Sequence, residues 1–443
     1  SARELIDAAI AQAEAVNGDI NAIIHPRFER AQKEADAGLP TGPFTGVPMV
    51  LKDLGAPLAG EPHHMGTRFL KNEKYIASRS SYLTQRFLRA GFVVIGRTNT
   101  PEFGAGSHTF NPLFGVTRNP FDPQKTAGGS SGGAAAALAS GMVALADGSD
   151  MGGSLRNPAA FCNIVGLRPS MGRIPTIPKT QETFSRMAVE GPMARTVEDC
   201  AMMLRVMAGA DKRDPRSLDM GALNTSPTLT DAPENLRLAW APNPAGLPIE
   251  PAVSSVLEAA LLDMQHLYPA IEEIDLSELK GAMEIFNVLR AAAFAEGLGY
   301  LYHSHQGKMK ATVIDNIKLG LELTSDSLAQ AEAQRAGLYR GMTSLFDRFD
   351  YLLLPVTQVM PFQVELEYPT TINKEVMNSY IDWMSSCCIL SPFDVPCLSI
   401  PAGFNTDGLP VGLQIVGRPG DDWGVLRLAY AFQQHTGHWQ QPP

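Results

Sequence analysis

The spacing of apolar residues along the chain predicts an alternation of helices and short buried strands. Apolar side chains three or four residues apart are typical of amphipathic helices, and short apolar runs between turn residues are typical of buried strands. Helices are expected at 5–17, 27–37, 79–90, 134–139, 196–208, 252–267, 281–300, 325–348 and 423–435. Strands are expected at 47–51, 92–95, 142–146, 351–354, 397–400 and 412–416. This order predicts an α/β fold in which helices cover a sheet.

Two segments depart from this alternation. Residues 210–235 are polar and rich in Asp, Pro, Ser and Thr, which predicts a long loop. Residues 126–146 carry no charge, but they contain five glycines and their apolar content is mostly alanine. Such a segment is too weakly hydrophobic for a membrane-spanning helix, so another role must explain it.

Composition narrows the class of protein. The chain has 36 basic and 46 acidic residues, a net charge of −10, and no basic stretch, which argues against a nucleic-acid partner. Five cysteines without CxxC spacing argue against a disulfide framework and favour a reducing, cytoplasmic compartment. The sequence begins at Ser1 without a methionine, so a signal peptide removed upstream stays open.

Glycine is concentrated in 128–153, which holds eight of the 40 glycines. Its first part, 126–133 (TAGGSSGG), leads directly into an Ala-rich helix. A glycine-rich loop at a helix N-terminus gathers backbone N–H groups that can hold an anion or a developing oxyanion. The same residues would also suit a simple helix cap in a packed turn. The loop is not a Walker A motif, because no Lys-Ser or Lys-Thr follows its last glycine.

A second glycine pair precedes Ser154 in 150–156 (DMGGSLR). Two glycines let the backbone turn tightly and point successive N–H groups into one space, as an oxyanion hole requires. Lys52 follows the apolar run 47–51. A lysine there either extends its ammonium group to solvent or, if buried, loses its charge readily and serves as a base.

Other motifs fit less well. Residues 128–132 (GGSSG) match the G-x-S-x-G elbow of α/β-hydrolases, but that elbow needs a preceding strand, and 118–125 is polar with two prolines. The pairs His63-His64 and His303/His305 lack metalloprotease spacing, so surface or capping roles are expected for them.

Taken together, these segments resemble the amidase signature family. The strings TAGGSSGGAAAALASG and GSDMGGSLRNPAAFCNIVGLRPS carry the resemblance, with Ser154 24 residues after Ser130 and Lys52 78 residues before Ser130. Further similar segments lie at 96–103, 119–122, 191–196, 396–404 and 408–414. The resemblance therefore covers nearly the whole chain and is patchy only between about 215 and 345.

The resemblance implies a Ser-cisSer-Lys triad. It assigns Ser154 as nucleophile, Ser130 as a proton relay held by a cis peptide bond, and Lys52 as general base. It implies an oxyanion hole at the backbone N–H groups of Met151, Gly152, Gly153 and Ser154, and supporting roles for Ser131, Asp150 and Arg156. Ser149 stands where the family often has threonine, and Met151 also departs from the common residue.

The resemblance further implies a single α/β domain over 1–443, with a large mixed sheet flanked by helices on both faces. Its signature core spans about 47–200, and a more variable, substrate-shaping region spans about 210–395. The implied activity is hydrolysis of a small-molecule carboxamide without cofactor, metal, nucleic acid or membrane, and a homodimer is compatible with it. Two alternatives stay open, namely the glutaminase subunit of a tRNA-dependent amidotransferase and a non-catalytic ligand-binding relative. Specificity is expected from loops at about 170–190, 300–330 and 355–395.

Overall fold

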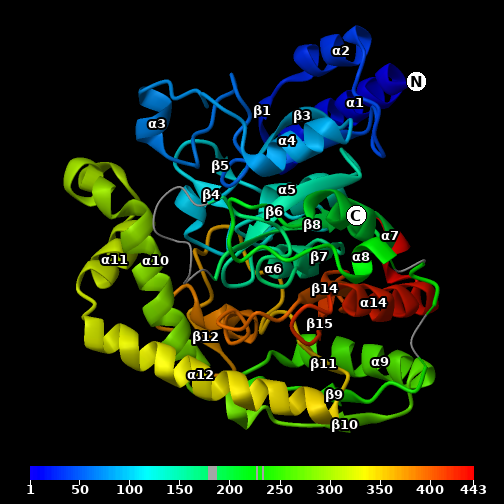
Figure 1. The fold of residues 1–443 in the computed structure, drawn as a ribbon, viewed down its shortest axis with the longest axis vertical. Coiled ribbons are helices and arrows are strands. Elements are labelled where there is room, and N and C mark those ends of the chain that lie inside the picture. The colour runs from blue at the N-terminus through cyan, green and yellow to red at the C-terminus, as the bar shows by residue number, and fades with distance from the viewer. Residues whose placement is uncertain (178–186, 226–227, 232–233) are drawn as a thin grey trace.

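A mixed sheet of eleven strands forms the centre of the computed structural model, which describes residues 1–177, 187–225, 228–231 and 234–443 (Figure 1). The strand order is β1-β3-β2-β6-β8-β7-β14-β15-β11-β9-β10. Neighbours pair in parallel within β3-β2-β6 and within β11-β9-β10, and the other pairs are antiparallel. The strands are β1 Ile23–Pro26, β2 Pro48–Lys52, β3 Val93–Thr98, β6 Leu145–Asp150, β7 Val165–Arg168, β8 Val189–Ala194, β9 Leu238–Trp240, β10 Ile271–Glu273, β11 Tyr351–Pro355, β14 Cys397–Phe404 and β15 Pro410–Val416.

Helices surround this sheet, and two short hairpins lie outside it. The hairpins are β4 Phe110–Asn111 with β5 Gly115–Val116, and β12 Thr371–Ile372 with β13 Glu375–Val376. The helices are α1 Ala2–Ile20, α2 Phe28–Ala37, α3 Arg68–Asn72, α4 Tyr82–Arg89, α5 Gly132–Ala139, α6 Arg156–Phe161, α7 Val197–Met207, α8 Ala222–Thr225, α9 Pro251–Leu267, α10 Ala282–His305, α11 Ala311–Leu321, α12 Ser325–Arg348, α13 Ser385–Cys388 and α14 Asp422–Thr436.

Strand β2 shows that helices cover both faces of the sheet. Met49 and Leu51 pack in one apolar cluster with residues of α4, α7, α9 and α14. Val50 packs on the opposite face with residues of α1 and α5. Successive side chains of a strand point to opposite faces, so a strand buried on both faces reads as an uninterrupted apolar run. The predicted α/β fold is confirmed, and Lys52, two residues after Val50, is directed toward α5.

The structure changes three sequence-based predictions. Helix α1 continues through Gly18 and ends at Ile20, followed by the C-cap residue Asn21, whose φ of 57° is left-handed. Strand β6 starts at Leu145 and extends to Asp150, because it pairs with β8 over its whole length, whereas the apolar run predicts a strand at 142–146. Helix α11 lies in a segment for which the sequence pattern predicts no helix.

The uncharged segment 126–146 contains a loop, the buried helix α5 and the start of β6. The side chains of α5 from Ala134 to Leu138 are fully buried, which explains their apolar character. None of the helices in the described residues combines the length and apolar character that crossing a bilayer requires.

Candidate active site

Lys52 is buried at the end of β2, with only 1% of its surface exposed. Its Nζ donates hydrogen bonds to three hydroxyl groups: Ser130 Oγ at 2.7 Å, Ser131 Oγ at 2.9 Å and Ser149 Oγ at 3.0 Å. Its backbone N–H donates to Asp147 Oδ1 at 2.8 Å, which fixes the end of the strand. No ion pair to Lys52 occurs within the described ranges, so its amino group is surrounded by neutral hydroxyls.

This environment favours the neutral form of the lysine. Burial lowers the pKa of Lys52 to about 8, and the negative charges of Glu190, Asp147 and Asp150 only partly oppose that effect. A neutral amine within hydrogen-bond distance of a hydroxyl can accept its proton. The geometry and the lowered pKa therefore both suit Lys52 to proton transfer with Ser130.

Ser130 and Ser131 lie where the glycine-rich loop enters α5. The peptide bond between Gly129 and Ser130 is cis, as the sequence resemblance implied. Ser131 stands at the N-cap of α5, and its backbone N–H donates to the carbonyl oxygen of Ser154 at 3.3 Å. This bond joins the two glycine-rich loops and brings Ser130 and Ser154 to the same cavity. The hydrogen bonds of the described residues do not include one between the two Oγ atoms.

The loop before Ser154 presents backbone donors to that cavity. Met151, Gly152 and Ser154 line it, and their N–H groups have no acceptor in the part of the chain that the structure describes. Buried backbone N–H groups are nearly always paired, so such a set of free donors indicates a place for water or a ligand oxygen. The N–H of Gly153 instead donates to Asp150 Oδ1 at 2.8 Å. Three of the four predicted oxyanion donors are thus free to bind a ligand.

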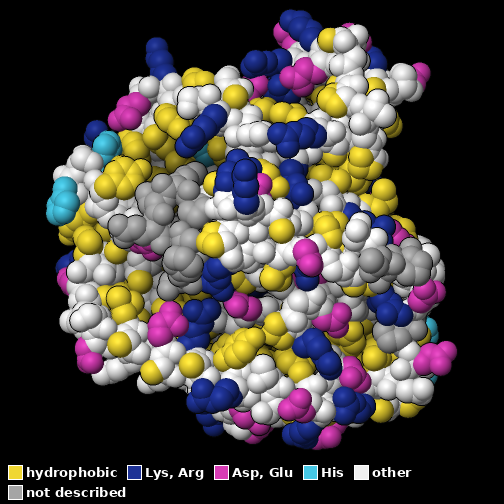
Figure 2. Space-filling view, in the orientation of Figure 1, with side chains coloured by type: hydrophobic (Ala, Val, Ile, Leu, Met, Phe, Trp, Pro, Cys, Tyr) yellow, Lys and Arg dark blue, Asp and Glu magenta, His cyan; other side chains and the backbone are white. Residues whose placement is uncertain are grey.

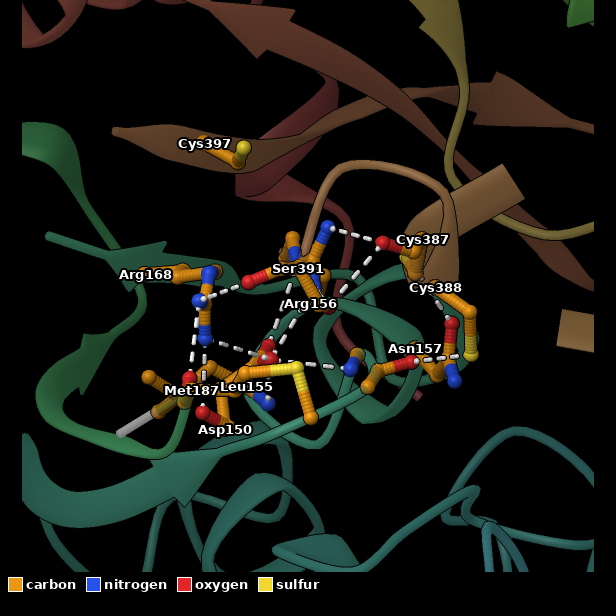
Figure 3. A network of polar contacts seen from close by, with 12 residues as sticks. Asp150, Leu155, Arg156, Asn157, Arg168, Met187, Cys387, Cys388, Ser391 and Cys397 are labelled. Carbon is orange, nitrogen blue, oxygen red and sulfur yellow. Dashed lines mark hydrogen bonds and ion pairs between the residues drawn. The ribbon is translucent and has the colours of Figure 1, made fainter. Parts of the chain in front are cut away.

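Asp150 holds this loop in place. Its carboxylate forms ion pairs with Arg156 Nη2 at 2.9 Å and Arg168 Nη1 at 3.3 Å, and it accepts the N–H of Leu155 at 3.1 Å (Figure 3). All three charged side chains are buried. Burial alone would raise the pKa of Asp150, but the two guanidinium groups hold it well below its usual range. Arg156 also donates to the carbonyl oxygen of Cys387 at 3.1 Å, which links the loop to α13.

The cavity has a volume of about 120 Å³ and a mostly apolar wall. Its lining beyond the predicted site residues comprises Leu54, Phe103, Gly104, Gly106, Ser107, Ser149, Ala188, Phe286, Arg290, Phe294, Tyr380, Ile381 and Met384. A second cavity of about 390 Å³ adjoins it and shares Ser149, Met151 and Ala188.

Figure 2 shows acidic and basic side chains interspersed on the face drawn, with hydrophobic ones between them.

Several lining residues carry no signal in the motifs of the sequence. Ser149 stands out there only as a departure from the family, yet its hydroxyl contacts Lys52. Phe286 and Arg290 come from α10, which lies in the region expected to shape the substrate site, although the sequence pattern singles out no residue of this helix. A charged residue within an otherwise apolar helical stretch, as Arg290 is, is the signal that could have identified it. Of the segments expected to set specificity, 355–395 contributes Tyr380, Ile381 and Met384 to the wall of the first cavity. Leu328, from the expected segment 300–330, lines the second cavity. Residues 178–186 of the segment 170–190 lie outside the described residues.

The surface role expected for the histidine pair is wrong. His63 and His64 are both buried, and His63 Nδ1 lies 2.6 Å from Arg97 Nη2 and 3.3 Å from Asp53 Oδ1. The fold buries His63 because Arg97 of β3 and Asp53, which follows β2, supply polar partners that the sequence alone does not bring together.

Sequence and structure comparisons agree with this geometry. The family model described as Amidase matches residues 4–426. The chain is 33% identical to an acylamidase from Rhodococcus erythropolis, over 98% of this chain and 92% of that protein. It is 32% identical to a glutamyl-tRNA(Gln) amidotransferase subunit from Methanosarcina barkeri, over 97% of this chain and 92% of that protein.

The fold is also that of a solved enzyme. A bacterial aryl acylamidase of the amidase signature family superposes with a TM-score of 0.92 at 30% identity, covering 100% of this chain and 95% of that chain. Since the family model and these relatives each span most of the sequence, the whole chain and not only its glycine-rich core shares their architecture. The chain belongs to the amidase signature family.

Proposed function

We propose that this protein hydrolyses the C–N bond of a small-molecule carboxamide through an acyl-enzyme on Ser154. The observation that carries the proposal is the meeting, in one cavity, of Ser154, Ser130 and three backbone N–H groups without acceptors among the described residues. The buried Lys52, 2.7 Å from Ser130 Oγ, supports it by supplying a base. The acylamidases among the relatives act on the same type of bond.

Acylation begins when Ser154 Oγ attacks the carbonyl carbon of the amide. The Ser154 proton passes to Ser130 Oγ, and the Ser130 proton passes to neutral Lys52 Nζ. The carbonyl oxygen becomes an oxyanion that accepts hydrogen bonds from the free N–H groups of the 151–154 loop. Hydrogen bonds between catalytic side chains often form only in the complex with substrate. The absence of a Ser130–Ser154 bond in the free protein is therefore compatible with the relay.

The second proton transfer completes amide cleavage. Lys52 returns its proton through Ser130 to the amide nitrogen, the C–N bond breaks, and ammonia or an amine leaves instead of an unstable amide anion. Water then attacks the ester carbonyl of Ser154, losing a proton along the same relay. The acid is released, and Ser154 regains its proton.

We also propose that 1–443 forms one domain, with its signature core at about 47–200. A single continuous sheet runs from β1 at one edge to β10 at the other, which supports a single domain. The more variable region then contributes α10 and residues 380–384 as a wall of the cavity.

The glutaminase subunit of a tRNA-dependent amidotransferase is the second candidate. The observation in its favour is the 32% identity to the amidotransferase subunit from Methanosarcina barkeri. Assays of the purified chain distinguish the two candidates, because an amidase hydrolyses simple amides without partner subunits. Glutamine hydrolysis that starts only when partner subunits are added would support the second candidate instead.

The pH dependence of turnover tests the role of Lys52. Because the amine must be neutral to accept a proton and its pKa is about 8, we expect kcat/KM to fall as pH drops below that value. The decrease should approach about tenfold per pH unit for a single essential base. The measurement is kcat/KM for an uncharged amide from about pH 5 to about pH 10, a range that brackets the titration of the base. A rate that does not change across this range would contradict the assignment.

The backbone donors are tested by Gly152→Ala. A Cβ at this position would lie 2.8 Å from Phe286 Cζ and 3.1 Å from Cys388 Sγ, so either the loop or the packed side chains must shift. We expect kcat to fall by up to about 100- to 1,000-fold, the loss found when one oxyanion donor is removed. Gly18→Ala is the matched control, because a Cβ there meets no atom within 4 Å. Equal kcat for the two variants would argue against an oxyanion role for the loop.

A further inference from the structure

Arg290 is a buried cation in the wall of the cavity that Ser154 lines. It projects from α10, and only 7% of its surface is exposed. The cavity lining contains just one other charged residue among the described ranges, Asp150. That carboxylate is already paired with Arg156 and Arg168, so it does not neutralise Arg290.

The surroundings of Arg290 position its guanidinium without neutralising it. Its Nη1 donates to Asn316 Oδ1 of α11. The guanidinium carbon lies 4.8 Å from the ring centre of Phe294 and 5.2 Å from that of Tyr380. The hydroxyl of Tyr380 in turn accepts a hydrogen bond from Asn316 Nδ2 at 3.2 Å. Aromatic rings and a neutral amide orient a cation, but they supply no opposite charge.

The charge is costly in this environment. In the part of the chain that the structure describes, Arg290 forms no ion pair with a carboxylate, and Asn316 is the one side-chain acceptor for its guanidinium N–H groups. Burial lowers the pKa of Arg290 to about 10, which still leaves the group protonated at neutral pH. Buried charges in proteins are generally paired, so an oriented and unpaired cation beside a nucleophile indicates that its partner is a ligand.

We propose that Arg290 binds a carboxylate of the substrate, so that the preferred substrates are short amides carrying a carboxylate group. A planar guanidinium binds a carboxylate through two parallel N–H···O bonds, which also fixes the orientation of the amide toward Ser154. Because Arg290 and Ser154 line the same cavity, a short linker between the two groups suffices to reach both. This inference rests on the proposed amidase function, because it assigns the substrate class of that same site.

Matched substrate pairs test the inference. Succinamate and butanamide differ mainly in one carboxylate, as do glutaramate and pentanamide. We expect the wild-type kcat/KM to favour the charged member of at least one pair by about 100-fold, typical for a buried charge pair. In Arg290→Met this ratio should fall to about one, and Arg290→Lys should retain part of it. Arg340→Met, which removes an exposed arginine of α12, should leave the ratio unchanged. A wild-type ratio near one, or a ratio unaffected by Arg290→Met, would overturn the inference.

Binding of the products separates this inference from the proposed function. Succinate and glutarate need no turnover, so calorimetry should detect at least one of them with the wild type, and Arg290→Met should weaken that binding at least tenfold. Equal binding by both proteins would overturn the carboxylate site even if neutral amides are hydrolysed. Arg290-dependent binding without hydrolysis of any amide would leave the site in place and overturn the amidase function.

The thermal midpoint provides a control for folding. Since Arg290→Met removes an unpaired buried charge, the variant without ligand should melt at the same temperature as the wild type or higher. Succinate or glutarate should raise the midpoint of the wild type more than that of the variant. A variant that melts well below the wild type would indicate a structural role and contradict the proposal.

Discussion

Replacing Ser154 with alanine is expected to lower kcat for amide hydrolysis by about 10⁶-fold, the loss found when a serine nucleophile is removed. The free N–H groups of Met151 and Gly152 remain, so the variant can still bind and polarise a carbonyl group. It lacks the atom that forms the acyl-enzyme, and water in its place is neither positioned nor activated. The measurement is steady-state hydrolysis of an amide that the wild type turns over.

The control for this result is Ser255→Ala, which removes an exposed hydroxyl on α9. It should retain wild-type activity. Ser154→Ala should keep the circular dichroism spectrum and the thermal midpoint of the wild type, because a hydroxyl at the cavity wall contributes little to folding. A Ser154→Ala enzyme with more than about one per cent of wild-type kcat would contradict the assignment, since that loss is far smaller than nucleophile removal causes.

Replacing Asp150 with alanine is expected to destabilise the fold by about 3–5 kcal/mol. The substitution leaves Arg156 and Arg168 as two buried guanidinium groups without a carboxylate, and it removes the acceptor for the N–H groups of Gly153 and Leu155. The 151–154 loop should lose its conformation as well, so activity should fall together with stability. Urea denaturation followed by fluorescence measures the stability.

An aspartate–arginine pair at the surface provides the matched comparison. Asp36 pairs with Arg3 at 2.6 Å, but about half of each side chain is exposed. Asp36→Ala should change stability by less than about 1 kcal/mol, because exposed pairs contribute little. If both variants lost equal stability, the buried network would not be the main constraint on the loop.

The resemblance to a known family, and not the local sequence alone, identifies Lys52, Ser130 and Ser154 as candidates. The apolar run before Lys52 predicts a buried strand, but only the structure shows that the lysine is directed to the face covered by α5. The glycines around Ser130 and before Ser154 predict tight turns. These patterns could not show which N–H groups of the loop are free. The N–H of Gly153, for example, donates to the carboxylate of Asp150.

The contribution of α10 to the cavity wall could not be predicted from the sequence, for a physical reason. Arg290 reaches the cavity because α10 packs beside α11 and α13, far from Ser154 in the chain. Helical periodicity predicts the existence of α10 but does not indicate which of its faces meets the site. The same limitation explains His63, whose partners are Arg97 of β3 and Asp53, the residue after β2.

Intact-mass spectrometry of the protein with a slowly hydrolysed amide is the most direct test of the central claim. The wild type should gain the mass of the acyl group, and peptide mapping should place it on Ser154. The adduct should decay as the acid is released, and Ser154→Ala should show none. An acyl adduct on another residue, or one that persists in Ser154→Ala, would contradict the proposed acyl-enzyme.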